Sequence, residues 1–359
     1  MNNNRIQIKA LKAGNGDSFL ISYIGNHGKR VNIMVDGGNG RQTFEDHIRK
    51  EIESRIKKKQ IIDVFIITHI DQDHIKGLIY LTEDIKNPSS PILGSSIDKY
   101  WFNSAQKDKK VTTLIRNLDV SAREMAVFES YLHTLPDIQW DINNRLKMPM
   151  EIELYGAKIT ILSPNDELMA KFQTAYGNPD VGFQSTDYKK TINELKKLEN
   201  RMYNEQKEDL DEKLQNATSI AFLLEYKEKS LLYLGDAIPE IIKVSLKQIL
   251  MDRKVEKLKV DAVKLSHHGS RKSLSVTMLK MIDSRKFIIS TNGKKAGLPN
   301  KSTIAKILLG TERKEGERIT FHFNYENFSD CLNLTVDEKR ADHFECLNAN
   351  YQHGYCLTI

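Results

Sequence analysis

The sequence contains few cysteines and no long apolar run. Its three cysteines, Cys331, Cys346 and Cys356, lie near the C-terminus without CxxC spacing. This odd, late set argues against a disulfide framework and against zinc ligation by thiols, and it favours a reducing compartment. No stretch approaches the roughly 18 apolar residues of a membrane span, and the polar start over residues 1–5 lacks the apolar segment of a secretory signal. We therefore expect a cytoplasmic protein with no membrane contact.

The sequence also lacks a strong charge of either sign. Its 359 residues include 54 basic and 48 acidic side chains, which gives a net charge of +6. This balance permits a polyanionic partner such as nucleic acid but does not require one. The apolar fraction of 40% and the charged fraction of 28% are typical of a globular protein. There is no internal repeat and no low-complexity segment.

Short apolar runs alternate with amphipathic stretches along most of the chain. Runs at 6–11, 18–24 and 31–35 are separated by Gly and Asn, which predicts strands joined as hairpins. The run Ile61 to Thr68 is almost entirely apolar, as in a strand buried on both faces. Further β segments are expected at 97–102, 152–162, 219–225, 230–234, 262–265 and 287–290, and helices at 43–58, 75–81, 121–135 and 239–250. Such alternation predicts an α/β fold built of layers.

The composition changes between residues 166 and 215. The part from 188 to 214 is rich in Lys, Glu and Asn and carries one narrow apolar stripe. We interpret it as a helical insertion lying on the core, with coiled-coil contact to a protein partner as the alternative. We expect one domain over residues 1–310 that includes this insertion. A C-terminal extension over 311–359 would pack on the core and add strands to a sheet edge.

Four of the ten histidines fall in two tight groups, each directly after a predicted buried strand. The carboxyl ends of strands in an α/β sheet converge where ligands bind. Two imidazoles and two carboxylates within six residues favour a divalent cation, which cancels the repulsion of the carboxylates. Helix capping explains one of these carboxylates but not the whole set. The candidate ligands are His69, Asp71, Asp73 and His74, then Asp236 after a later strand, then His267 and His268.

Four segments of the chain resemble the metallo-β-lactamase superfamily. The string THIDQDHIKG is similar to its signature His-x-His-x-Asp-His, with Asp71 in place of the second histidine. This variant resembles the branch that contains the hydrolase domain of the DNA-uptake competence protein ComEC. GNGDSFLI, LLYLGDA and VKLSHHGSRKS are similar to further segments of that branch, and together the four cover about residues 6 to 310. The resemblance implies a four-layer αββα sandwich with the site along one edge of two facing sheets.

The resemblance also implies how the ligands are shared between metal ions. His267 is favoured over His268 as a ligand because it directly follows the strand, and His268 would then orient the substrate or donate a proton, although the two roles could be exchanged. The superfamily has a further histidine before the bridging Asp, whereas here none occurs between His133 and His267. One ion is therefore short of a ligand, or absent. The implied set is His69 and Asp71 for one ion, Asp73, His74 and His267 for a second, and Asp236 as the bridge.

The expected chemistry follows from this ligand set. Asp71 in place of an imidazole makes the site richer in oxygen, which favours manganese relative to zinc; we retain both metals, as one or two ions. A bound cation lowers the pKa of water and polarises the bond under attack. Asp73 would accept a hydrogen bond from the attacking water, and His268 or Ser270 would stabilise developing charge.

These residues predict a metal-dependent hydrolase. Its expected activity is that of a phosphodiesterase or nuclease acting on nucleic acid or a nucleotide-derived substrate. Hydrolysis of a lactone, thioester or carboxylic ester uses the same site and is one alternative. A metal-stabilised non-catalytic subunit of a defence or DNA-processing complex is another. Basic residues near the expected site mouth would either contact phosphate or remain solvated; they are Arg271, Lys272, Lys294 and Lys295.

Three further polar residues stand near the motifs. Asp17 in GNGDS is interpreted as a turn-forming carboxylate rather than a catalytic one. Asp36 matches a position that is structural in the superfamily. Asn216 would either line the pocket or form a plain strand-entry turn.

Overall fold

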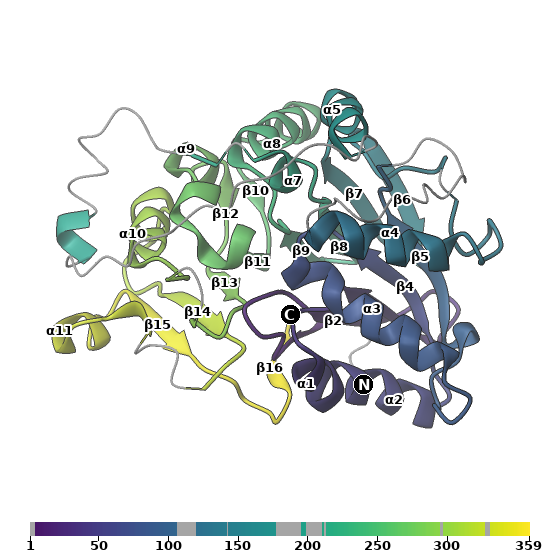
Figure 1. The fold of residues 1–359 in the computed structure, drawn as a ribbon. Helices are drawn as coiled ribbons and strands as arrows, with labels where there is room; N and C mark the ends of the chain where they lie inside the picture. The colour runs from purple at the N-terminus through teal and green to yellow at the C-terminus, as the bar shows by residue number, and fades with distance from the viewer. Residues whose placement is uncertain are drawn as a thin grey trace.

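The computed structural model describes residues 4–105, 120–141, 143–176, 195–198, 210–211, 213–294, 297–326 and 331–359. Within these residues two large sheets face each other (Figure 1). Sheet A has six strands in the order β16-β1-β2-β3-β4-β5, and sheet B has eight in the order β15-β14-β13-β11-β9-β8-β7-β6. A short parallel pair, β10 (Leu258–Lys259) and β12 (Ile282–Asp283), lies beside them.

Sheet A is built mainly by the N-terminal part of the chain. Its first three strands pair antiparallel, as the Gly and Asn turns predict, and the next two are added in parallel. The C-terminal strand pairs with β1, placing Thr358 opposite Gln7. The strands are β1 (Gln7–Leu11), β2 (Phe19–Ile24), β3 (Arg30–Val35), β4 (Ile62–Ile67), β5 (Ile97–Phe102) and β16 (Gly354–Thr358).

Sheet B is antiparallel from β6 to β9 and parallel from β9 to β15. The β segment expected at 152–162 is a hairpin, because left-handed backbone at Tyr155 and Gly156 reverses the chain. The strands of sheet B are β6 (Met150–Leu154), β7 (Ala157–Ser163), β8 (Ala221–Tyr226), β9 (Lys229–Tyr233), β11 (Ala262–Lys264), β13 (Lys286–Ile289), β14 (Ile319–Phe323) and β15 (Phe344–Leu347).

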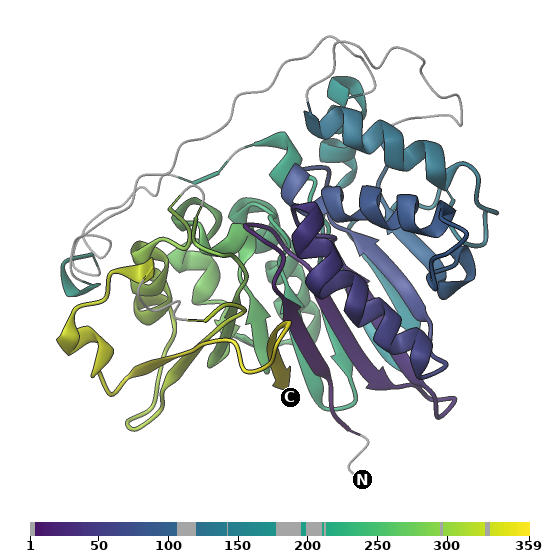
Figure 2. The ribbon, with the colours of Figure 1, turned by 60° about the horizontal axis from the view of Figure 1, so that its bottom comes forward.

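Three apolar clusters hold four layers together. One lies between the sheets, where Ile33 and Val64 of sheet A and Leu224 of sheet B are fully buried. The second packs helices on the outer face of sheet A: α2 (Arg49–Lys57), α3 (Gln72–Lys86) and α4 (Val120–Leu132). The third packs helices on sheet B: α8 (Pro239–Arg253), α9 (Val276–Leu279) and α10 (Lys301–Gly310). Figure 2 shows the two halves side by side, each with its own helices. The predicted αββα sandwich is confirmed.

The predicted insertion and C-terminal extension both meet the sheets. Within 166–215 the structure describes α5 (Asp166–Tyr176), α7 (Leu214–Ala217) and a helical turn at 195–198, where Leu195 and Leu198 are buried against the cluster on sheet B. Most of the helix expected over 188–214 lies outside the described residues. After residue 311 the chain adds β14 and β15 to sheet B and β16 to sheet A. Among the described helices, none has the length and apolar character of a membrane span.

Candidate metal centre

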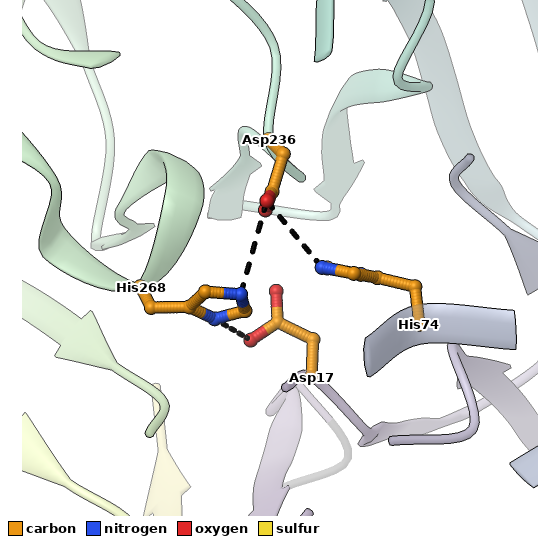
Figure 3. Close-up of side chains that lie close together, drawn as sticks. All are labelled: Asp17, His74, Asp236 and His268. Atoms are coloured by element: carbon orange, nitrogen blue, oxygen red, sulfur yellow. Dashed lines mark hydrogen bonds and ion pairs between the residues drawn. The ribbon is translucent and has the colours of Figure 1, made fainter. Parts of the chain in front are cut away.

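The two histidine groups meet at one edge of the sandwich, where strands of both sheets end. β4 leads to His69 from sheet A, while β9 leads to Asp236 and β11 to His267 from sheet B. The turn after β1 brings Asp17 to the same place. Figure 3 shows side chains from these segments pointing toward one another. The convergence expected at the carboxyl ends of the strands is therefore observed.

The first loop places its carboxylates away from simple capping roles. Asp71 occupies the position before α3, but its side chain makes no capping hydrogen bond. Asp73 lies in the first turn of α3, where the helix dipole stabilises its negative charge. The side chains of Asp71 and Asp73 remain 29% and 23% exposed, whereas that of His74 is fully buried. The loop thus presents two accessible carboxylates beside buried imidazoles.

Four imidazoles face one carboxylate oxygen. Oδ2 of Asp236 lies 3.4 Å from Nε2 of His74, 3.8 Å from Nε2 of His268, and 3.9 Å from Nε2 of both His69 and His267. Two ligands that each lie about 2.1 Å from a metal ion are about 3.0–3.5 Å apart. The observed spacing is close to that range, so a small movement of the side chains would seat an ion among them.

Each of these imidazoles is held through its other nitrogen. Nδ1 of His74 lies 2.9 Å from Oδ2 of Asp36, and Nδ1 of His69 lies 3.0 Å from Oγ1 of Thr68. Asp36 also accepts hydrogen bonds from the backbone N–H and the hydroxyl of Thr68, so it is a structural residue that orients a candidate ligand. Metal-binding histidines characteristically have such a partner on the second nitrogen.

The nitrogens that face Asp236 are left without hydrogen bonds. Nε2 of His69, His74 and His268 is buried and makes no hydrogen bond to a described residue. An orphaned buried polar atom costs about 1–3 kcal/mol. A divalent cation would give all three nitrogens a partner, so this donor set fits zinc or manganese.

Sequence reasoning missed two members of the centre, Asp17 and Lys264. Asp17 is fully buried, forms an ion pair with the Lys264 ammonium, and places Oδ1 3.2 Å from Nδ1 of His268. Candidate ligand atoms of Asp17, His74, Asp236 and His268 all lie within 4.8 Å of one another (Figure 3). Asp17 therefore has a role beyond the turn, because it contacts both Lys264 and Nδ1 of His268.

Burial and neighbouring charges set the protonation of the centre without metal. Burial lowers the pKa of His69 to about 3, and the charge of His74 adds to this effect. Partial burial raises the pKa of Asp71 to about 6, with the neighbouring Asp73 adding to it. Burial also disfavours the charged form of His268, but the carboxylates of Asp236 and Asp17 outweigh it and raise its pKa to about 10. A cation that binds His268 would thus displace a proton.

A second group of polar residues surrounds His267. Its Nδ1 lies 3.3 Å from Oδ2 of Asp211, 3.2 Å from Nδ2 of Asn216 and 3.2 Å from Oγ of Ser273. Asn216 therefore lies beside His267, in the segment that enters β8. Asp211 belongs to the insertion, and its position in a polar segment gave no sign of this contact. Ser270, which was expected to stabilise charge, is buried and accepts a hydrogen bond from the backbone of Lys272.

Comparison with known proteins identifies structural neighbours but no sequence family. No family model and no curated protein matches the chain. The chain is similar to the metallo-β-lactamase fold protein YhfI from Bacillus subtilis, with 10% identity over 98% of this chain and 99% of that one and a TM-score of 0.42. The chain is also similar to Zn²⁺-bound PqqB from Methylobacterium extorquens, with 14% identity over 98% of this chain and 99% of that one and a TM-score of 0.40. A diphosphatase from the PhnP family shares 12% identity over 99% of this chain and 97% of its own, with a TM-score of 0.40.

Proposed function

We propose that the protein is a metal-dependent hydrolase that cleaves phosphodiesters in nucleic acid or in a nucleotide-derived substrate. The observation that carries the metal-dependent part is the convergence of four imidazole Nε2 atoms on Oδ2 of Asp236. A divalent cation bound there supplies Lewis-acid chemistry, which makes hydroxide available near neutral pH and polarises the scissile group.

The residues of this chain orient the reaction. Asp36 and Thr68 hold two of the imidazoles from behind, so their Nε2 atoms stay aimed at the centre. Asp73 lies at the accessible side of the centre, 3.5 Å from Nε2 of His268, and in this proposal its carboxylate accepts a hydrogen bond from the attacking water. Ser270 is proposed to shape the turn beside His268 through its hydrogen bond to the backbone of Lys272.

The choice of a phosphodiester rests on ligand chemistry and surrounding charge. The substitution of Asp71 for an imidazole makes the centre rich in oxygen, as suits ions that act on phosphate. The ComEC-like form of the motifs and the net charge of +6 point the same way. The Lys272 carbonyl accepts a hydrogen bond from the N–H of Asp211, the residue whose carboxylate faces His267, so this basic residue lies beside the centre. Arg271 and Lys294 are exposed; Lys295 lies outside the described residues.

The experiment compares substrate classes under one set of metal conditions. The purified protein, loaded with Mn²⁺ or Zn²⁺, is incubated with bis-p-nitrophenyl phosphate, with DNA and RNA, and with a lactone and a thioester. We expect turnover of the phosphodiesters that Asp236→Asn lowers by at least about 100-fold. Asp252→Asn on the exposed face of α8 is the matched control and should retain full activity.

Two results would contradict this proposal. Turnover of the lactone or thioester alone would assign the centre to carboxylic esters. Absence of any turnover, together with cellular function that survives Asp73→Ala and His74→Ala, would assign it to a metal-stabilised subunit. A protein partner at residues 188–214 remains a separate proposal.

A further inference from the structure

His267 and His268 are adjacent in the chain, yet both point at the same carboxylate oxygen. Their Nε2 atoms lie 3.9 and 3.8 Å from Oδ2 of Asp236. Successive side chains of an extended segment point in opposite directions. Here the two rings instead approach from different sides of one point, with centroids 5.8 Å apart and planes at 79°.

This arrangement depends on an uncommon backbone. His267 and His268 both have left-handed conformations, with φ of 48° and 54°. A residue with a Cβ adopts this conformation only at an energetic cost, because the Cβ comes too close to the following carbonyl oxygen. The turn is held in place by hydrogen bonds at His267, whose N–H donates to the Gly235 carbonyl over 3.1 Å and whose carbonyl accepts from Ser270 over 2.9 Å. Strain of this kind persists where the surroundings require it, and it clusters at functional sites.

The two rings have separate anchors. Nδ1 of His268 faces Oδ1 of Asp17 at 3.2 Å and the Ser290 carbonyl at 3.0 Å. Nδ1 of His267 faces Asp211 and Ser273 instead. Each anchor leaves Nε2 on the side of Asp236. The imidazoles of His267 and His268 are therefore both oriented through Nδ1, as are those of His69 and His74.

His268 lies beside Asp73 and His74, the last two candidate ligands of the first loop. Its Nε2 lies 3.5 Å from Oδ2 of Asp73, and its ring centroid is 5.2 Å from that of His74. Asp17, also close, has one oxygen on Nδ1 of His268 and the other on Lys264, so it acts as an anchor rather than a ligand.

The first two candidate ligands of the loop, His69 and Asp71, would leave an ion short of a ligand, and His267 is the remaining imidazole at the centre. Nε2 of His69 lies 3.9 Å from Oδ2 of Asp71, and Nε2 of His69 and Nε2 of His267 each lie 3.9 Å from Oδ2 of Asp236. No other histidine is available, because all ten are described and the remaining six lie elsewhere. His27 stacks on Tyr155, His133 contacts Trp140, His322 contacts Tyr355, His343 contacts Phe344, and His47 pairs with His353.

We propose that the two adjacent histidines bind different metal ions. One ion is held by His69, Asp71 and His267, the other by Asp73, His74 and His268, and Asp236 lies between them. The superfamily has a histidine before the bridging Asp that this chain lacks, and in this assignment His267 supplies that imidazole. His268 is then a ligand rather than a proton donor. The inference rests on the proposed metal centre but not on the substrate.

The test counts metal ions in variants that keep the turn. Asn tolerates left-handed backbone and is too short to reach the ions, so His267→Asn and His268→Asn remove one ligand each without straining the chain. We expect the metal content after dialysis with Zn²⁺ or Co²⁺ to fall from about two ions per chain to about one in each variant. The visible band of the Co²⁺ protein should fall to about half in both, with different residual spectra, because different ligands remain.

A second variant addresses the anchor. Asp211→Asn should lower the affinity for the ion held by His267 by about 10- to 100-fold, because a ligating histidine loses its partner. The affinity for the other ion should not change. The matched control is His27→Asn, a solvent-exposed histidine away from the centre, which should keep both ions.

The outcomes separate this inference from the proposed function. Loss of one ion in each histidine variant supports the split assignment even if no phosphodiester is cleaved. Three results overturn it whatever the activity: a single ion in the unmodified protein, loss of metal from only one of the two variants, or loss of all metal from both.

Discussion

The ammonium of Lys264 forms an ion pair with the carboxylate of Asp17, and both side chains are completely buried. The lysine also donates a hydrogen bond of 2.9 Å to the Gly235 carbonyl and lies 3.8 Å from Oδ1 of Asp236. One oxygen of Asp236 therefore faces the ammonium, while the other faces the four imidazoles. Lys264 thus fixes which oxygen of Asp236 is presented to the histidines.

We predict that Lys264→Met destabilises the protein by about 3–5 kcal/mol, because breaking a buried pair leaves an uncompensated charge. Urea unfolding of both proteins in the presence of a chelator measures the difference. Lys264→Met combined with Asp17→Asn should recover part of the loss, since neither charge then remains. A double variant no more stable than Lys264→Met alone would show that the lysine acts through packing instead.

This pair also illustrates what the sequence could and could not predict. The strands and the histidine groups were predicted because apolar periodicity and ligand spacing are local patterns. Asp17 stands in a Gly- and Asn-rich turn, so its local pattern indicates only a turn. Its role depends on Lys264 and His268, which the fold brings from the opposite sheet. The same holds for Asp211, whose contact with His267 crosses from the insertion.

Removal of metal should lower the stability of the folded protein. Asp17, Asp73 and Asp236 place negative charge around buried imidazoles, and a divalent cation that binds only the folded chain stabilises it. At a free metal concentration of about 100 times Kd this amounts to about 2.7 kcal/mol. Thermal unfolding with chelator and with added Mn²⁺ or Zn²⁺ measures the shift. Asp236→Asn should show little or no shift, and an equal shift in that variant would contradict the assigned centre.

The turn after β1 is packed directly against the ligand loop. A Cβ added at Gly16 would lie 1.7 Å from the Asp73 carbonyl oxygen, which accepts a hydrogen bond from the N–H of Asp17. Gly16→Ala should therefore push Asp73 out of position and weaken metal affinity by at least about 10-fold, as expected when a ligand loses its support. Competition with a chromogenic chelator gives the affinity. Gly94→Ala is the matched control, because its Cβ would meet open space. Equal affinities in both variants would refute this packing argument.

The pH dependence of stability should include a clear contribution from His322, which lies outside the metal centre. His322 is 3% exposed and has no hydrogen bond to a described residue. Burial, with the charge of Lys286, lowers its pKa to about 4 from the ordinary value of 6.5. Between pH 6.5 and 4 the unfolded chain therefore binds more protons than the folded one, and stability falls as the pH is lowered through this range.

This contribution reaches about 2 kcal/mol at pH 5 and is nearly absent at pH 7. His322→Phe keeps an aromatic ring against Tyr355, whose centroid lies 4.9 Å from that of His322, but cannot take up the proton. Urea unfolding in chelator at pH 7 and pH 5 should show a loss in the unmodified protein that exceeds the loss in the variant by about 2 kcal/mol. All other titrating groups are common to both proteins and cancel in the comparison. Equal losses would mean that His322 is protonated in the folded state at pH 5, which its burial without a partner argues against.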